Sequence, residues 1–153
     1  MGGYGGASGK TKDKCYRDTG GNKVKDKNAI EVAEYYIKSG KYVAFLQEKP
    51  PKNRADLSVD GVHVEVKGLS TLSPNTVESK LRHAHKQIHS EDDRYNIETH
   101  RQGKIIILSR HDNKIEKSTI ISKMREGVSI AMKKGYLDEK VELWIGKDIY
   151  QLN

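Results

Sequence analysis

The sequence predicts an α/β protein of the α+β kind, with a central mixed sheet flanked by helices. Three observations carry this prediction: three stretches with apolar residues at helical spacing, a short alternating hairpin between the first two, and a continuous apolar run at residues 104–108. The order is helix, strand, hairpin, helix, strand, helix and strand, which is typical of an α/β sandwich.

The composition divides the chain into two parts. The 153 residues suffice for one core, and 28 Lys and Arg outnumber 21 Asp and Glu. Seven of these basic residues and three of the acidic ones fall within residues 1–27, which are rich in glycine. We therefore predict a flexible basic linker over 1–27 and a folded domain over 28–153. The net charge of +7 favours a polyanionic partner, although the folded part carries little of it.

Several classes of protein are not favoured. No run of roughly 18 apolar residues is present, so no membrane segment is predicted. The first residues lack the apolar stretch of a secretory signal. Cys15 is the single cysteine, which leaves no internal disulfide and gives no sign of a shaped nucleophile.

The first elements have clear local signals. A helix is predicted over 28–38, with Asn28 as N-cap, Glu31 as its capping-box partner and Gly40 as the stop. Residues 41–46 form a short apolar strand, and two prolines at 50–51 cannot continue a ladder.

The later elements follow the same periodicities. A second helix is predicted over 76–89, with its core stripe formed by Val77, Leu81, Ala84 and Ile88. Residues 90–103 are polar and expected to be irregular, and 104–108 form a central strand covered on both faces. A helix over 116–134 is expected to turn Ile120, Ile121, Met124, Val128, Ala131 and Met132 inward. Residues 141–145 form a further strand, and residues 149–150 extend or cover the sheet edge.

The hairpin around Asp60-Gly61 is the most informative stretch. The dipeptide predicts a two-residue type I′ turn, so that residue 59 pairs with 62 and residue 57 with 64. One face then carries the apolar residues Leu57, Val59, Val62, Val64 and Val66. The other carries Asp56, Ser58, His63, Glu65 and Lys67.

This register sets Asp56 opposite Glu65, with their Cβ atoms roughly 4.5–5.5 Å apart. Two like charges at this separation repel each other, and a divalent cation held between them removes the repulsion. Lys67 lies two residues along the same face, close enough to act on the same substrate. Charged residues on the wet face of a hairpin are also common without any function, so a structural interpretation stays open.

The pattern Asp56…Glu65-Val66-Lys67, between a first helix and a basic second helix, resembles the PD-(D/E)xK nuclease superfamily. Within that superfamily the chain looks most like the C-terminal toxin domains of contact-dependent growth inhibition proteins, over about residues 28–109. One departure is Ala55, which stands where the family has a proline before the aspartate. The chemistry needs the carboxylate rather than the proline.

The resemblance implies a restriction-endonuclease-like core and a metal-dependent nuclease. Asp56 and Glu65 would ligate Mg²⁺ or Mn²⁺, and their oxygens do not exclude Zn²⁺. Lys67 would stabilise the charge growing on the phosphate or orient the attacking water. Glu31 resembles the family's first-helix glutamate, a further ligand, with a plain helix cap as the alternative. Gln87 resembles the family's active-site glutamine, which holds phosphate or water.

Substrate contacts are expected from His63, His83, Lys86 and Thr71. A metal-independent ribonuclease with His63 or His83 as general base is a competing interpretation. It leaves the juxtaposition of the two hairpin carboxylates unexplained.

A second pair of histidines invites a different interpretation. His85 and His89 lie four residues apart on one helical face, and such pairs can bind zinc. The sequence has neither an HExxH motif nor a cysteine partner beyond Cys15. We therefore expect a solvated or phosphate-contacting face.

Taken together, these features predict a metal-dependent endonuclease toxin domain that hydrolyses nucleic acid. The resemblance slightly favours RNA, and tRNA within it, over DNA. The alternatives are a DNA endonuclease of the same superfamily and a non-catalytic basic nucleic-acid-binding module. A cognate immunity protein, delivery as part of a larger secreted or surface protein, and action in the cytoplasm of a target cell are implied by the resemblance alone.

Overall fold

The computed structural model describes residues 15–47, 54–95 and 103–153. These residues form three helices and six strands. The helices are α1 (Lys27–Lys38), α2 (Pro74–Tyr95) and α3 (Lys117–Lys133). The strands are β1 (Val43–Phe45), β2 (Leu57–Val59), β3 (Val62–Leu69), β4 (Gly103–Ser109), β5 (Lys140–Ile145) and β6 (Asp148–Gln151).

The strands form one mixed sheet in chain order, β1-β2-β3-β4-β5-β6. The first three strands are antiparallel, β3, β4 and β5 run parallel, and β6 returns antiparallel to β5. The predicted α+β fold, with a mixed sheet flanked by helices, is therefore confirmed. No helix in these described ranges combines the length and apolar character needed to cross a membrane.

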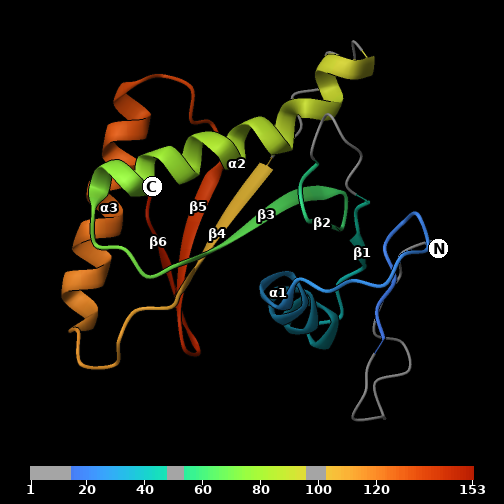
Figure 1. The fold of residues 1–153 in the computed structure, drawn as a ribbon, viewed down its shortest axis with the longest axis horizontal. Coiled ribbons are helices and arrows are strands. Elements are labelled where there is room, and N and C mark those ends of the chain that lie inside the picture. Colours follow the sequence, from blue (N-terminus) through green and yellow to red (C-terminus); the bar gives the residue numbers. More distant parts are fainter. Residues whose placement is uncertain (1–14, 48–53, 96–102) are drawn as a thin grey trace.

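The helices cover both faces of the sheet (Figure 1). Helices α2 and α3 pack together over one face, where their buried residues form a core with β4 and β5. Helix α1 covers the other face, against β1, β2 and β3. The continuous apolar run in β4 follows from this arrangement, because Ile105 and Ile107 face one core and Ile106 and Leu108 the other.

The predicted hairpin register is confirmed. Leu57 pairs with Val64 and Val59 with Val62. Asp60 and Gly61 have φ angles of 47° and 84°, as both central residues of a type I′ turn require. The turn also closes onto the preceding segment, because the Asp60 carboxylate accepts a hydrogen bond from the Tyr42 amide at 2.9 Å.

The predicted core stripe of α2 is confirmed, but the ends of two helices differ from the prediction. Asp26, not Asn28, caps α1, because its carboxylate accepts hydrogen bonds from the amides of Asn28 and Ala29. Helix α2 begins at Pro74 and runs on to Tyr95, so residues 90–95 are helical rather than irregular. Residues 96–102 of the expected irregular segment lie outside the described residues.

One residue of α3 was assigned to the wrong face. Met132 is 53% exposed, whereas the rest of the expected stripe is buried or packed against the core. The physical reason is helical geometry, since Met132 follows the buried Ala131 and points about 100° away from it.

The predicted boundary after residue 27 has to be moved toward the N-terminus. Residues 15–26 were expected to belong to the basic linker, but Tyr16 is 3% exposed and packs on Phe45 with a ring-centroid distance of 5.2 Å. The Tyr16 hydroxyl donates a hydrogen bond to Glu34 of α1 at 2.8 Å. This segment therefore belongs to the folded part, and residues 1–14 of the expected linker lie outside the described residues.

Gly127 sets the distance between α2 and α3. A Cβ atom there would lie 2.5 Å from Val77 Cγ1 and 3.1 Å from the Pro74 carbonyl oxygen. The side chain of Val77 therefore packs directly against the backbone of α3 at this point.

We predict that Gly127→Ala lowers the free energy of unfolding by about 1–3 kcal/mol, because overpacking outweighs the helix propensity that alanine gains. Urea denaturation at an unchanged m-value measures the effect. Adding Val77→Ala should recover part of the loss, because it removes the clashing methyl groups. A Gly127→Ala protein as stable as the parent would show that the helices can separate here without cost.

Candidate functional site

The polar face of β3 lies under helix α2. Glu65 is 2% exposed and His63 7% exposed, so the face is covered by the helix rather than wet. Lys67 lies two residues further along the same face of β3, at the margin of the helix, and its side chain is 23% exposed. The middle of β3 is thus covered on both faces, and a buried charged residue on such a strand requires a partner.

Asp56 and Glu65 hold each other in place through backbone groups. The Asp56 amide donates to Glu65 Oε1 at 3.0 Å, and the Val66 amide donates to Asp56 Oδ2 at 2.9 Å. Strand β2 begins only at Leu57, so the Asp56 carboxylate supplies the acceptor that a further strand residue would have given to Val66. The two carboxyl groups are therefore neighbours, as the register predicts.

The proximity of these two acids changes their protonation. Burial is the main cause that raises the pKa of Asp56, and the hydrogen bond from the Val66 amide does not cancel it. Burial also raises the pKa of Glu65, and the adjacent charge of Asp56 raises it further. Lys67 acts in the opposite direction on both groups without reversing either shift. The pair consequently retains a proton under conditions in which isolated carboxyl groups are ionised.

Lys67 and Gln87 complete the group. Lys67 Nζ lies 3.0 Å from Glu65 Oε2 and donates to Gln87 Oε1 at 2.8 Å. Gln87 comes from α2, on the flank that faces β3. The structure therefore brings together four predicted catalytic residues, Asp56, Glu65, Lys67 and Gln87. We call these four the carboxylate-pair site.

A cleft of about 340 Å³ borders this site on the side of Asp56. Its walls are formed by residues 22–26 with Asp18, Ala29, Phe45, Leu46 and Gln47. The cleft is lined by two exposed lysines, Lys23 and Lys25, together with the carboxyl groups of Asp18, Asp26 and Asp56. These lysines lie in the segment that the sequence assigned to the linker.

Glu31 is not brought to the carboxylate pair. Its described contact is with Arg110, whose Nη2 lies 2.9 Å from Glu31 Oε1 and also donates to Asn28 at 2.7 Å. Because Asp26 caps the helix, Glu31 has no capping role either. Neither expected role of Glu31 is supported by these contacts.

The residues expected to bind substrate are dispersed. His63 is buried beneath α2, which leaves a polymeric substrate no surface of the ring to contact. His83 and Lys86 are exposed on α2. Thr71 stabilises the loop before α2, where its hydroxyl accepts a hydrogen bond from the Ser73 amide at 3.0 Å and its carbonyl one from His111 at 2.6 Å.

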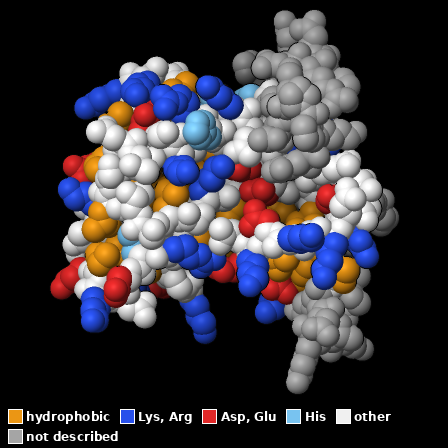
Figure 2. Space-filling model, viewed as in Figure 1, with side chains coloured by type: hydrophobic (Ala, Val, Ile, Leu, Met, Phe, Trp, Pro, Cys, Tyr) orange, Lys and Arg blue, Asp and Glu red, His pale blue; other side chains and the backbone are white. Residues whose placement is uncertain are grey.

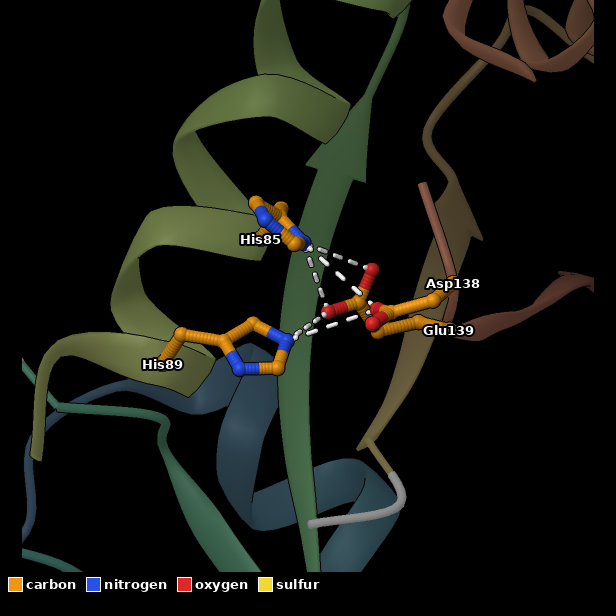
Figure 3. Close-up of side chains that lie close together, drawn as sticks. All are labelled: His85, His89, Asp138 and Glu139. Carbon is orange, nitrogen blue, oxygen red and sulfur yellow. Dashed lines mark hydrogen bonds and ion pairs between the residues drawn. The ribbon is translucent and has the colours of Figure 1, made fainter. Parts of the chain in front are cut away.

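A second cluster lies on the opposite flank of α2 (Figure 3). His85 and His89 face Asp138 and Glu139, which precede β5, and the four ligand atoms lie within 4.8 Å of one another. The histidines are thus not simply a solvated face, and these four residues could hold a metal ion. The four-residue spacing of His85 and His89 is the sequence signal for such a site. Their acidic partners lie about 50 residues away and carry no local sequence signal.

Asp56→Asn should stabilise the fold in the absence of divalent cations. The asparagine amide keeps an acceptor for Val66 and can donate to Glu65, while one charge of the repelling pair is removed. Because burial raises both carboxyl pKa values, their ionisation destabilises the parent as the pH rises above about 4. In EDTA near pH 8 we expect a gain of about 1 kcal/mol, or roughly 3 °C in Tm.

The gain should largely disappear near pH 3, where both carboxyl groups are mostly protonated in the folded and unfolded chains. Asp148→Asn, an exposed aspartate paired with Lys117, is the matched control. A lower Tm for Asp56→Asn near pH 8 would show that the pair is not under electrostatic strain.

The chain was compared with known proteins at the levels of family, sequence and structure. No protein-family model matches it, and neither a curated protein nor a solved structure does. Its function therefore has to be argued from the geometry and chemistry of its own side chains.

Proposed function

We propose that this chain is a metal-dependent nuclease whose catalytic group is Asp56, Glu65, Lys67 and Gln87. The observation that carries the proposal is the buried carboxyl group of Glu65, which touches the half-buried carboxyl group of Asp56 beside an ammonium group. A fold selected for stability alone would avoid this arrangement, because each acid is desolvated next to a like charge. Such conflicts are concentrated at functional sites.

The donor set fits a divalent cation. Asp56 and Glu65 offer hard carboxylate oxygens, which suit Mg²⁺ or Mn²⁺ and do not exclude Zn²⁺. These two residues would hold the ion, which when bound polarises a phosphoryl oxygen and lowers the pKa of a water molecule. Binding of a cation would also make ionisation of both acids favourable, which removes the conflict just described.

The other two side chains act on the substrate. Lys67 is held between Glu65 and Gln87, so its ammonium group is fixed at the margin of α2, where it is accessible to solvent. From there it would stabilise the negative charge that grows on the phosphate or orient the attacking water. Gln87 fixes the direction of the lysine and offers its amide group to phosphate or water.

Nucleic acid is the proposed substrate. Lys23 and Lys25 line the cleft beside Asp56, where they can neutralise phosphates on either side of the scissile bond. On the face drawn in Figure 2, Lys and Arg side chains are spread with acidic groups among them rather than gathered in one patch. Binding would therefore depend on the cleft more than on the general charge of the surface.

The finer assignment rests on the resemblance to toxin domains of contact-dependent growth inhibition proteins. On that basis we propose RNA, with tRNA slightly favoured over DNA, as the substrate in the cytoplasm of a target cell. A cognate immunity protein and delivery from a larger secreted or surface protein belong to the same proposal. A DNA endonuclease and a non-catalytic binding module are the alternatives that the first experiment below separates.

We expect Asp56→Ala and Lys67→Ala each to reduce cleavage by at least about 10²-fold, as loss of a charge-stabilising group does. Total tRNA and plasmid DNA are incubated with the protein in Mg²⁺ or Mn²⁺, with EDTA as the negative condition. Asp148→Ala and Lys147→Ala, two exposed residues remote from the site, should cut at the parent rate.

Cleavage of tRNA alone would support the RNA assignment, and cleavage of plasmid alone would favour the DNA enzyme. Salt-sensitive binding with no cleavage in any metal would make the chain a binding module. Parent-level cleavage by either site variant would remove the carboxylate-pair site from the mechanism.

The two cleft lysines should affect binding rather than chemistry. We expect Lys23→Ala/Lys25→Ala to raise KM roughly tenfold at moderate salt, to leave kcat unchanged, and to reduce the slope of log KM against log salt by about two. The pair Lys114→Ala/Lys147→Ala removes equal charge elsewhere on the surface. Equal effects from the two pairs would show that the cleft does not bind the substrate.

A further inference from the structure

The cluster of His85, His89, Asp138 and Glu139 is independent of the carboxylate-pair site. By strand spacing, Glu139 lies two strands and about two residues away from Glu65, which is roughly 12 Å between their Cα atoms. The two groups also lie on opposite flanks of α2, because Gln87 contacts Lys67 on one flank while His85 and His89 contact Glu139 on the other. The histidine cluster therefore requires its own explanation.

We propose that His85, His89, Asp138 and Glu139 form a zinc site that fastens helix α2 to the start of strand β5. Four protein ligands of this kind, two imidazoles and two carboxylates, suit Zn²⁺, whereas Mg²⁺ prefers oxygen ligands and keeps several waters.

Four of the six separations among the ligand atoms are close to the edges of a tetrahedron, and all six lie within 4.8 Å. His85 Nδ1 and His89 Nε2 lie 2.9 Å and 2.8 Å from Glu139 Oε2, and 3.7 Å and 3.4 Å from Asp138 Oδ1. Zinc–ligand bonds of 2.0–2.1 Å give tetrahedral edges of about 3.3–3.4 Å. Each of the four edges is thus within about half an ångström of that value, so side-chain adjustments alone would admit the ion.

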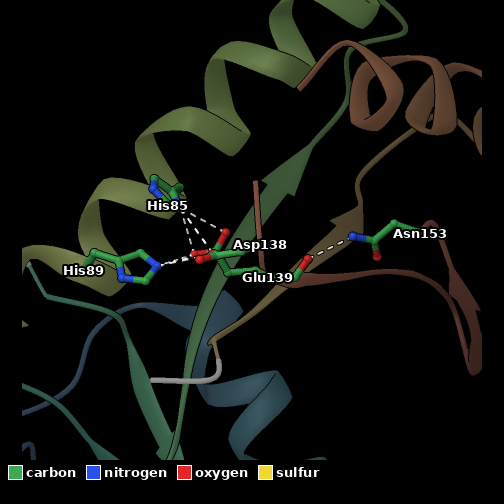
Figure 4. A network of polar contacts seen from close by, with 5 residues as sticks. All are labelled: His85, His89, Asp138, Glu139 and Asn153. Carbon is green, nitrogen blue, oxygen red and sulfur yellow. Dashed lines mark hydrogen bonds and ion pairs between the residues drawn. The ribbon is translucent and has the colours of Figure 1, made fainter. Parts of the chain in front are cut away.

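The position of Glu139 is built into the fold. Its side chain is 0% exposed, and a Cβ atom at Gly103 of β4 would lie 2.9 Å from its Cγ, so only glycine leaves room for it. Asn153 fixes the adjoining backbone, because its amide donates to the Glu139 carbonyl at 2.8 Å while its Oδ1 accepts from the Val141 amide (Figure 4). A fully buried carboxylate held so firmly requires a cationic partner.

The two imidazole rings lie within hydrogen-bond distance of this carboxylate. Burial alone would lower the pKa of His89, but the charge and hydrogen bonds of Glu139 and Asp138 outweigh it and raise this pKa. Because an imidazole ligates zinc in its neutral form, zinc binding would release any proton that His89 carries. His85 also packs against Tyr136, with ring centroids 5.4 Å apart, and this contact limits the movement of its ring.

The test uses Co²⁺ as a spectroscopic substitute for Zn²⁺ on the full chain. Tetrahedral Co²⁺ absorbs strongly in the visible region and octahedral Co²⁺ weakly. The titration is made in the Asp56→Asn background, so that the carboxylate-pair site does not contribute. We expect a tetrahedral spectrum that saturates at one Co²⁺ per chain, is displaced by Zn²⁺ and persists in excess Mg²⁺.

His89→Ala and Asp138→Asn should each weaken binding at least about tenfold, and the exposed His83→Ala on the same helix should not. Asp138 is 66% exposed, so its variant tests the site without threatening the fold. Zinc at about 100 times its dissociation constant should raise the Tm by about 5–10 °C, and His89→Ala should abolish this rise. No tetrahedral spectrum, or one that all three variants retain, would overturn the proposal.

Discussion

Both clusters depend on how helix α2 lies across the sheet. Its apolar stripe, buried to 1% exposure or less, fixes the rotation of the helix over β3 and β4. With that rotation set, Gln87 projects from one flank toward Lys67, while His85 and His89 project from the other toward Glu139. A helix turned by one residue, about 100°, would break every one of these contacts. Core packing and site geometry are therefore a single constraint in this molecule.

The carboxylate-pair site shows why burial matters for its chemistry. On an exposed hairpin, Asp56 and Glu65 would be screened by water, and their repulsion would have little effect. Beside α2 they are desolvated, which raises their pKa values. A bound cation therefore stabilises the folded state more than it would on an exposed hairpin. Lys67, at the margin of this cover, stays accessible to solvent while its ammonium group is held by Glu65 and Gln87.

Features with local causes could be predicted from the sequence. The Asp60-Gly61 turn fixes the hairpin register within four residues, and the register alone places Asp56 beside Glu65. The helix stripes follow from periodicity in the same way. Gln87 was expected from resemblance, and its contact with Lys67 follows from the tilt of α2, which no local pattern records.

Features that depend on distant partners could not be predicted. Asp26 and Asn28 are both good caps, and only the position of the preceding chain decides between them. The contact that holds Glu31 is with Arg110, which lies 79 residues later and leaves no local pattern in the sequence. Tyr16 stands in a polar, glycine-rich segment of the sequence, and only its contacts with Phe45 and Glu34 show that it belongs to the folded part. Asp138 and Glu139, the acidic members of the histidine cluster, could not be predicted for the same reason, because they lie about 50 residues from the histidines.

The hydrogen bond from Val66 to Asp56 also protects the sheet. Among the described residues, β2 pairs with β3 only as far as Val64, and an unpaired strand rim can recruit a strand from another molecule. The Asp56 side chain occupies the Val66 amide and sets a negative charge at the rim. An alanine in its place would leave the amide available, so the variant would be prone to intermolecular strand pairing and aggregation in concentrated solution.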